Sequence, residues 1–186
     1  LIDLPLLDFG TPALAPMQAL KAHLVLAKGQ LRLSDLSALV AGGRLSGATA
    51  FNPRGKAPHW SADLKFAGVN LDGWIQGLKK DGQAPNDKAR SYMTGTLNAT
   101  VALEGEGRSV AEILGSANGR LRARVANGEL SQLVTEAAGL DVAQALGMLI
   151  KGDEPLKLNC AQIDAVVVDG VVKSRHAVFD NADSTL

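Results

Sequence analysis

The sequence predicts a mainly β protein, a bent antiparallel sheet built as a meander of hairpins that forms an open groove or half-barrel. Several stretches alternate between apolar and polar residues, glycines separate them at short intervals, and few segments have helical spacing. Hydrophobic residues make up 46% of the 186 residues, which is enough for a sizeable core, but aromatic residues make up only 4%. The interior must therefore be built mainly from Ala, Leu and Val.

Outside residues 131–150 the chain has five motifs of the form Gly-x-Leu. Four of the five are followed by a stretch that can be read as a strand, and we expect the glycines to mark turns at which strands begin. The motifs start at Gly29, Gly43, Gly95, Gly119 and Gly128. Glycine suits such positions because it adopts backbone conformations that a β-carbon would strain. Short strands joined by glycine turns favour an antiparallel meander over units in which helices connect parallel strands.

Strands are expected where the side-chain character alternates with a period of two. Residues 60–66 and 97–104 alternate in this way, and in residues 120–125 three arginines alternate with Leu, Ala and Val. Each of these strands should therefore have one apolar face and one polar face. Residues 163–168 are rich in β-branched side chains and precede Asp169-Gly170, which predicts a further strand and a hairpin turn.

Helical signals are short and local. Ser109 and Glu112 have the spacing of a capping box and predict a short helix toward Leu114. Residues 131–150 form the one clearly helical region, and a single turn is expected within residues 72–78. The apolar stripe of the 131–150 region should pack on the sheet as a helical cap or plug at one end. That stripe consists of Leu133, Val134, Leu146 and Leu149.

The length suits a single domain over residues 1–186. Residues 82–90 contain Gln, Pro, Asn, Asp and Lys, and two interpretations of them stay open: a linker between two lobes, or an exposed loop within one sheet. No apolar run reaches the roughly 18–20 residues that a membrane-spanning helix needs. Because the sequence starts at Leu1 without a signal-like leader, we expect any membrane anchor to lie outside it.

The composition argues against several classes of function. Nineteen basic residues balance nineteen acidic residues, whereas a nucleic-acid-binding domain normally has a basic excess. His23, His59 and His176 lie far apart, with no second ligand at metal-binding spacing, and alternation puts His59 on a polar strand face. Cys160 alone makes no internal disulfide. We therefore expect no catalytic residue, no cofactor, no metal site and no enzymatic activity.

The remaining feature is a sheet with one apolar side and too little helix to cover it. Such a face can close on a second sheet, close into a barrel, or stay open as a groove that binds something apolar. Composition and alternation do not choose among these three arrangements.

A series of motifs along the chain has a familiar order. Residues 20–33 (LKAHLVLAKGQLRL) lead to a double-glycine hairpin at 40–47 (VAGGRLSG), and residues 105–109 (GEGRS) open a short helix. Residues 119–121 (GRL) and 127–130 (NGEL) follow, and a late strand with Cys160 precedes Asp169-Gly170. This order resembles the C-terminal periplasmic region of the AsmA family of Gram-negative envelope proteins, and the resemblance covers most of the chain.

The resemblance implies a periplasmic β-structure, tethered to the inner membrane by a segment not present here. Members of the family are linked to outer-membrane integrity and are thought to carry phospholipid along a groove lined by apolar side chains. The ligand would then be a phospholipid or another molecule with acyl chains, and envelope proteins would be further partners. Cys160 carries over as a packed strand residue without a redox role. The expected groove lining consists of Leu45, Phe51, Leu64, Phe66, Leu97, Val101, Leu121 and Val125.

Two hypotheses follow from different classes of function. In the first, the chain binds or conducts phospholipid along the apolar groove in support of outer-membrane biogenesis and integrity. In the second, it is a non-enzymatic interaction module that scaffolds outer-membrane protein assembly, with its sheet closed over a dry core. Lipid bound to the purified protein would separate the two.

Overall fold

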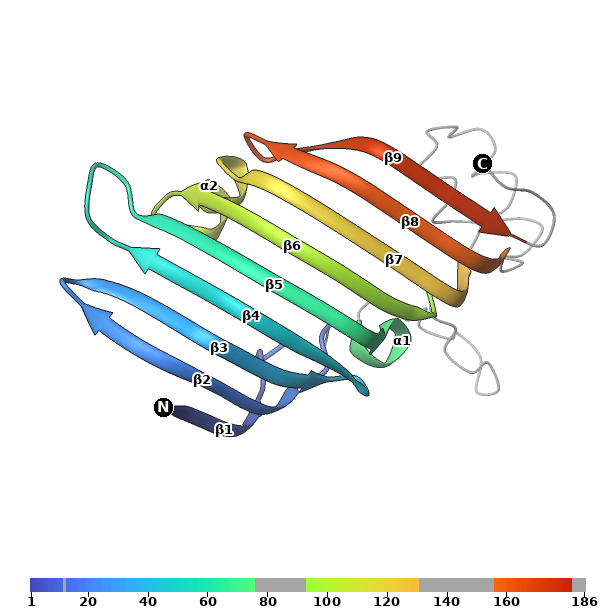
Figure 1. Cartoon of the computed structure of the whole chain (residues 1–186), viewed down its shortest axis with the longest axis horizontal. Helices are drawn as coiled ribbons and strands as arrows, with labels where there is room; N and C mark the ends of the chain where they lie inside the picture. Colours follow the sequence, from blue (N-terminus) through green and yellow to red (C-terminus); the bar gives the residue numbers. More distant parts are fainter. Residues whose placement is uncertain (12, 76–92, 131–155, 182–186) are drawn as a thin grey trace.

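In the computed structural model, the strands of a single sheet lie side by side in the order of the sequence (Figure 1). The structure describes residues 1–11, 13–75, 93–130 and 156–181. The nine strands of this sheet are β1 (Ile2–Leu7), β2 (Met17–Ala27), β3 (Gln30–Val40), β4 (Gly43–Asn52), β5 (His59–Asn70), β6 (Thr96–Glu106), β7 (Asn118–Leu130), β8 (Leu156–Val168) and β9 (Val171–Asn181). Every neighbouring pair is antiparallel. Since β1 and β9 are the two edges, the sheet is open and not closed into a barrel, and the mainly β prediction is confirmed.

Three hairpins turn through two residues that both have positive φ. These pairs are Lys28-Gly29, Ala41-Gly42 and Asp169-Gly170, with φ between 43° and 79°. Turns of this kind match the right-handed twist of the strands that they connect, and Gly adopts the conformation at no steric cost. The expected Asp169-Gly170 hairpin turn is confirmed, and it joins β8 to β9.

The glycine motifs divide into those that begin strands and those that do not. Gly29 and Gly95 immediately precede β3 and β6, and Gly43 is the first residue of β4. A strand also follows Gly119, the second residue of β7, but the turn expected at this glycine is wrong, because Gly119 already pairs within the sheet with a φ of 146°. The prediction was wrong for Gly128, which lies near the end of β7. A β-carbon at Gly119 would overlap the carbonyl oxygen of Ala102 on β6. Glycine is needed there because two backbones approach closely.

Two short helices lie at opposite ends of the strands (Figure 1): α1 (Leu71–Trp74) follows β5, and α2 (Val110–Gly115) follows β6. The expected Ser109 N-cap of α2 is confirmed, but Glu112 reaches back to the amide of the residue before the cap and not to the Ser109 amide. The Glu112 amide donates to the Ser109 Oγ at 3.2 Å, and the Glu112 carboxylate accepts from the Arg108 amide at 2.7 Å.

The single turn expected within residues 72–78 corresponds to α1, which Asn70 caps by accepting from the Gly73 amide at 2.7 Å. The helical cap expected at residues 131–150 lies outside the described residues, as does the 82–90 segment. The two strands that flank 82–90 are direct neighbours in the sheet, since β5 pairs with β6 from His59 to Asn70.

The hydrophobic core lies on one face of the sheet, toward the end that carries α1. Its buried cluster consists of Met17, Ala38, Val40, Leu45 and Val69. Trp74 of α1 packs against Phe66 with ring centroids 5.3 Å apart, and the Trp74 carbonyl accepts from the Ala15 amide at 2.8 Å. Helix α1 and the chain between β1 and β2 therefore join at this end of the sheet.

Candidate functional site

Strand register brings the eight expected lining residues onto one face of the sheet. Opposite partners in the register share a face because successive side chains along a strand point to alternate sides. The pairs that connect them are Leu45↔Phe66 between β4 and β5, Leu64↔Val101 between β5 and β6, and Val101↔Leu121 and Leu97↔Val125 between β6 and β7. Phe51 lies on β4, opposite Trp60. We call this side of the sheet the apolar face.

The apolar face continues beyond these four strands. Leu31, Leu33, Leu36 and Ala38 of β3 lie opposite apolar-face positions of β4, and β8 contributes Ala161, Ile163, Ala165 and Val167 opposite β7. Apolar side chains therefore follow one another from β3 to β8 without a charged residue among these positions. Neighbouring strands lie about 4.8 Å apart, so these six strands span about 24 Å across the sheet.

Burial divides the eight residues into two groups. Leu45 is 5% exposed and belongs to the buried core, while Leu64, Phe66 and Leu97 pack against that core. Phe51, Val101, Leu121 and Val125 are half-buried. Leu45 is thus a core residue, and the other seven residues of the group, on β4 to β7, are half-buried.

The opposite side of the sheet, the polar face, carries the charged residues of the same strands. One row across it runs from Lys65 on β5 through Thr100 on β6 and Arg122 on β7 to Asp164 on β8. The next row runs from Asp63 through Ala102 to Arg120. The alternation in residues 120–125 correctly predicts that the three arginines share a face, but the residues opposite them on β5 and β6 follow only from the register.

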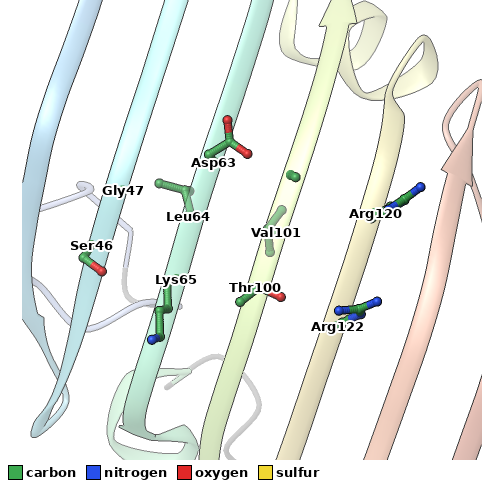
Figure 2. Close-up of a pocket in the computed structure, with 10 residues that line it drawn as sticks. Ser46, Gly47, Asp63, Leu64, Lys65, Thr100, Val101, Arg120 and Arg122 are labelled. Atoms are coloured by element: carbon green, nitrogen blue, oxygen red, sulfur yellow. The ribbon is translucent and has the colours of Figure 1, made fainter.

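The larger hollows described on this sheet are bordered mainly by residues of the polar face. One of about 380 Å³ lies over short side chains of β6, with Lys65 on one side of Thr100 and Arg122 on the other (Figure 2). Leu64 and Val101 also border it, where their strands pass between the charged residues. A second hollow of about 440 Å³ shares Lys65, Thr100 and Arg122 with the first and extends toward β8. We did not expect these hollows from the sequence.

Two arginines of the polar face have described partners. Arg122 donates from Nε to the Asp164 Oδ2 at 3.0 Å, and the pair is largely exposed on the arginine side. Arg124 donates from Nε to the Cys160 Sγ at 3.2 Å, and this hydrogen bond raises the pKa of Arg124 above its ordinary value. Cys160 is half-buried in β8, where it packs beside the arginine.

The histidines and acidic residues do not assemble a metal centre in the described part of the chain. His59 lies on the polar face as expected, with its Nε2 3.9 Å from a Glu104 oxygen and its Nδ1 3.8 Å from a Glu106 oxygen. Within the described ranges, no group of three or more His, Cys, Asp or Glu side chains could hold a metal ion. None of the helices described is long and apolar enough to cross a membrane.

Comparison with known proteins agrees with the order of the motifs. The model of the AsmA family matches residues 11–177. The chain is 28% identical over 171 residues to the AsmA family protein YhjG of Escherichia coli (strain K12). The aligned region covers 92% of this chain and 24% of that protein. The chain therefore spans about a quarter of the length of this relative, and no solved structure matches it. The family model covers β2 to β8 and β9 as far as Ala177, and this chain belongs to the AsmA family.

Proposed function

We propose that this chain is a periplasmic segment of an envelope protein and that its apolar face holds the acyl chains of phospholipid in support of outer-membrane biogenesis and integrity. The observation that carries the proposal is the continuous apolar face of an open sheet. Membership of the AsmA family supports the same assignment. In this proposal the protein is not an enzyme, and it is tethered to the inner membrane by a segment outside this sequence.

The physical argument concerns what the accessible part of the apolar face can bind. Val101 lies opposite Leu121, Val125 lies four residues further along β7 on the same face, and all three keep part of their surface accessible. Each CH₂ group that leaves water for such a surface contributes about 0.8 kcal/mol, so a flexible hydrocarbon chain gains stability along its whole length. Because the apolar-face positions named above on β3 to β8 carry no charge, nothing at them favours a polar ligand.

The experiment places a charge on this face. Val101→Glu and Val125→Lys each put an ionised group where an acyl chain would lie, and desolvating that group costs several kcal/mol unless it finds a partner. Thr96→Glu is the matched control, since Thr96 is an exposed residue of the same strand β6 on the opposite face. The readouts are the lipids that copurify with the protein, identified by mass spectrometry, and the integrity of the envelope in cells that produce each variant.

We expect folded Val101→Glu and Val125→Lys variants that have lost bound lipid and envelope function, and a Thr96→Glu variant that retains both. Folded variants at Val101 and Val125 with full lipid binding and full envelope function would contradict the lipid path. Variants that unfold at these two positions would instead favour a sheet closed over a dry core.

A second candidate function is an interaction module that scaffolds outer-membrane protein assembly. The observation in its favour is an exposed apolar cluster at the α2 end, where Val110 is 73% exposed and Leu114 is 57% exposed. The β8–β9 turn packs beside this helix, since the Gly170 amide donates to the Ala117 carbonyl at 2.9 Å. If Val110→Glu abolished envelope function while bound lipid stayed unchanged, this function would replace the first.

A further inference from the structure

Four cations gather on the polar face over β5, β6 and β7. This basic cluster consists of Lys65, Arg120, Arg122 and Arg124. Its three arginines occupy every second position of β7, so they are about 7 Å apart along the strand. Lys65 lies two strands away from Arg122, across Thr100, at a distance of about 10 Å between their backbones.

The acidic residues around the basic cluster do not balance it. Asp63 and Asp164 border the two hollows, which leaves four cations against two carboxylates. Asp164 is engaged by Arg122 at 3.0 Å, whereas Lys65 and Arg120 make no ion pair with any described carboxylate. The polar face of β1 and β2 differs, because Lys21 there pairs with Asp3 at 3.5 Å.

The hollows give the cluster a shape that a ligand can occupy. They hold about 380 and 440 Å³, within the range of small-molecule sites, and they meet at Lys65, Thr100 and Arg122. The surface is hollowed at this junction because the Thr100 side chain is short, while the Lys65 and Arg122 side chains on either side of it are long. The Thr100 hydroxyl adds a hydrogen-bond donor at the centre.

The donors favour one class of ligand. Guanidinium groups offer paired N–H donors, an ammonium group offers three more that can turn, and such donors bind best to an ionised group with several acceptor oxygens. A phosphoryl group, with at least two unesterified oxygens, further oxygens around the phosphorus and one or two negative charges, fits this set better than a carboxylate does. We propose that the basic cluster binds a phosphoryl group over Thr100, with Lys65 and Arg120 as its principal cationic ligands. This site lies on the face opposite the proposed acyl-chain surface and is independent of it.

The test measures binding of defined anions to the complete chain. Calorimetric titration measures the binding of inorganic phosphate, and succinate serves as the carboxylate probe at equal charge. Sedimentation with vesicles of phosphatidylglycerol or phosphatidylcholine tests whether a lipid headgroup supplies the phosphoryl group. The test variant is K65Q/R120Q, whose side chains are exposed and outside the described ion pairs. The matched control is Arg32→Gln, an exposed cation of β3 on the same polar face. Circular dichroism confirms that both variants fold.

We expect phosphate or phosphatidylglycerol vesicles to bind at least about tenfold more weakly to K65Q/R120Q, and within about twofold of the parent to the Arg32→Gln variant. Binding of free phosphate identifies a soluble source, and binding of the vesicles alone identifies a lipid headgroup, and both support the site. Equal binding of succinate, an unchanged affinity in K65Q/R120Q, or no binding in either arm would overturn the proposal.

Discussion

The open apolar face makes a quantitative prediction about two valines that receive the same substitution. Val101 is half-buried between Leu64 on β5 and Leu121 on β7. Val40 is 0% exposed in the core cluster. If the face is open at β6, a glutamate at position 101 keeps its carboxylate hydrated, whereas a glutamate at position 40 must be buried.

The magnitudes separate clearly. Full burial of a large apolar side chain contributes about 1.5–3 kcal/mol to stability. Because Val101 is only half-buried, its replacement removes part of this contribution, and glutamate is in addition a poorer strand residue than valine. We expect Val101→Glu to lower the free energy of unfolding by about 1–2 kcal/mol. Burial of a charge without a partner costs several kcal/mol more, so Val40→Glu should remove most of the stability of the fold.

Urea denaturation followed by circular dichroism measures both effects. With a slope of about 2 kcal/mol/M, the Val101→Glu midpoint should fall by about 0.5–1 M, while the Val40→Glu chain should have little or no folded baseline. Equal, severe losses at the two positions would refute the reasoning, because they would mean that Val101 lies in a closed core.

Two further predictions concern local backbone requirements. Gly47→Ala should lower the free energy of unfolding by more than about 1 kcal/mol, because Gly47 has a φ of 147° and a β-carbon there would overlap the Asp63 carbonyl. The control Gly115→Ala, which has open space around it, should leave the urea midpoint unchanged or raise it. A similar loss of stability in both variants would contradict the close approach of the Gly47 and Asp63 backbones. Ser109→Ala should cost α2 about 1 kcal/mol and speed hydrogen exchange of the Glu112 amide about fivefold, whereas an unchanged rate would mean that the cap does not hold this helix.

Alternation predicted the strands where the backbone is regular. Residues 97–104 and 120–125 lie in β6 and β7, which pair without a register shift, so their odd and even positions keep their faces along the whole strand. In β2 and β3 the pattern is broken, because register shifts occur near Ala19 and Asp35, which both have positive φ. Apolar residues there change their spacing although they stay on one side of the sheet.

The candidate site was predictable within strands but not between them. The three arginines of β7 share a face by alternation alone, whereas Lys65 and Thr100 become their neighbours only through the pairing of β5, β6 and β7. Gly119 was assigned to a turn because a sequence pattern does not distinguish a glycine that turns the chain from one that admits a neighbouring carbonyl. The burial of Leu45 likewise depends on Val69 and α1, which approach it only in the folded sheet.

The most direct test of the lipid assignment compares two adjacent positions of β7 that face opposite sides. A photoreactive amino acid replaces Leu121, on the apolar face, or Arg122, on the polar face, and the complete protein is irradiated in living cells. Mass spectrometry then identifies what is attached at each position. The account predicts that position 121 is cross-linked to the acyl chains of phospholipid. It predicts no cross-link to an acyl chain at position 122. Equal lipid adducts at both positions, or only protein adducts at position 121, would contradict it.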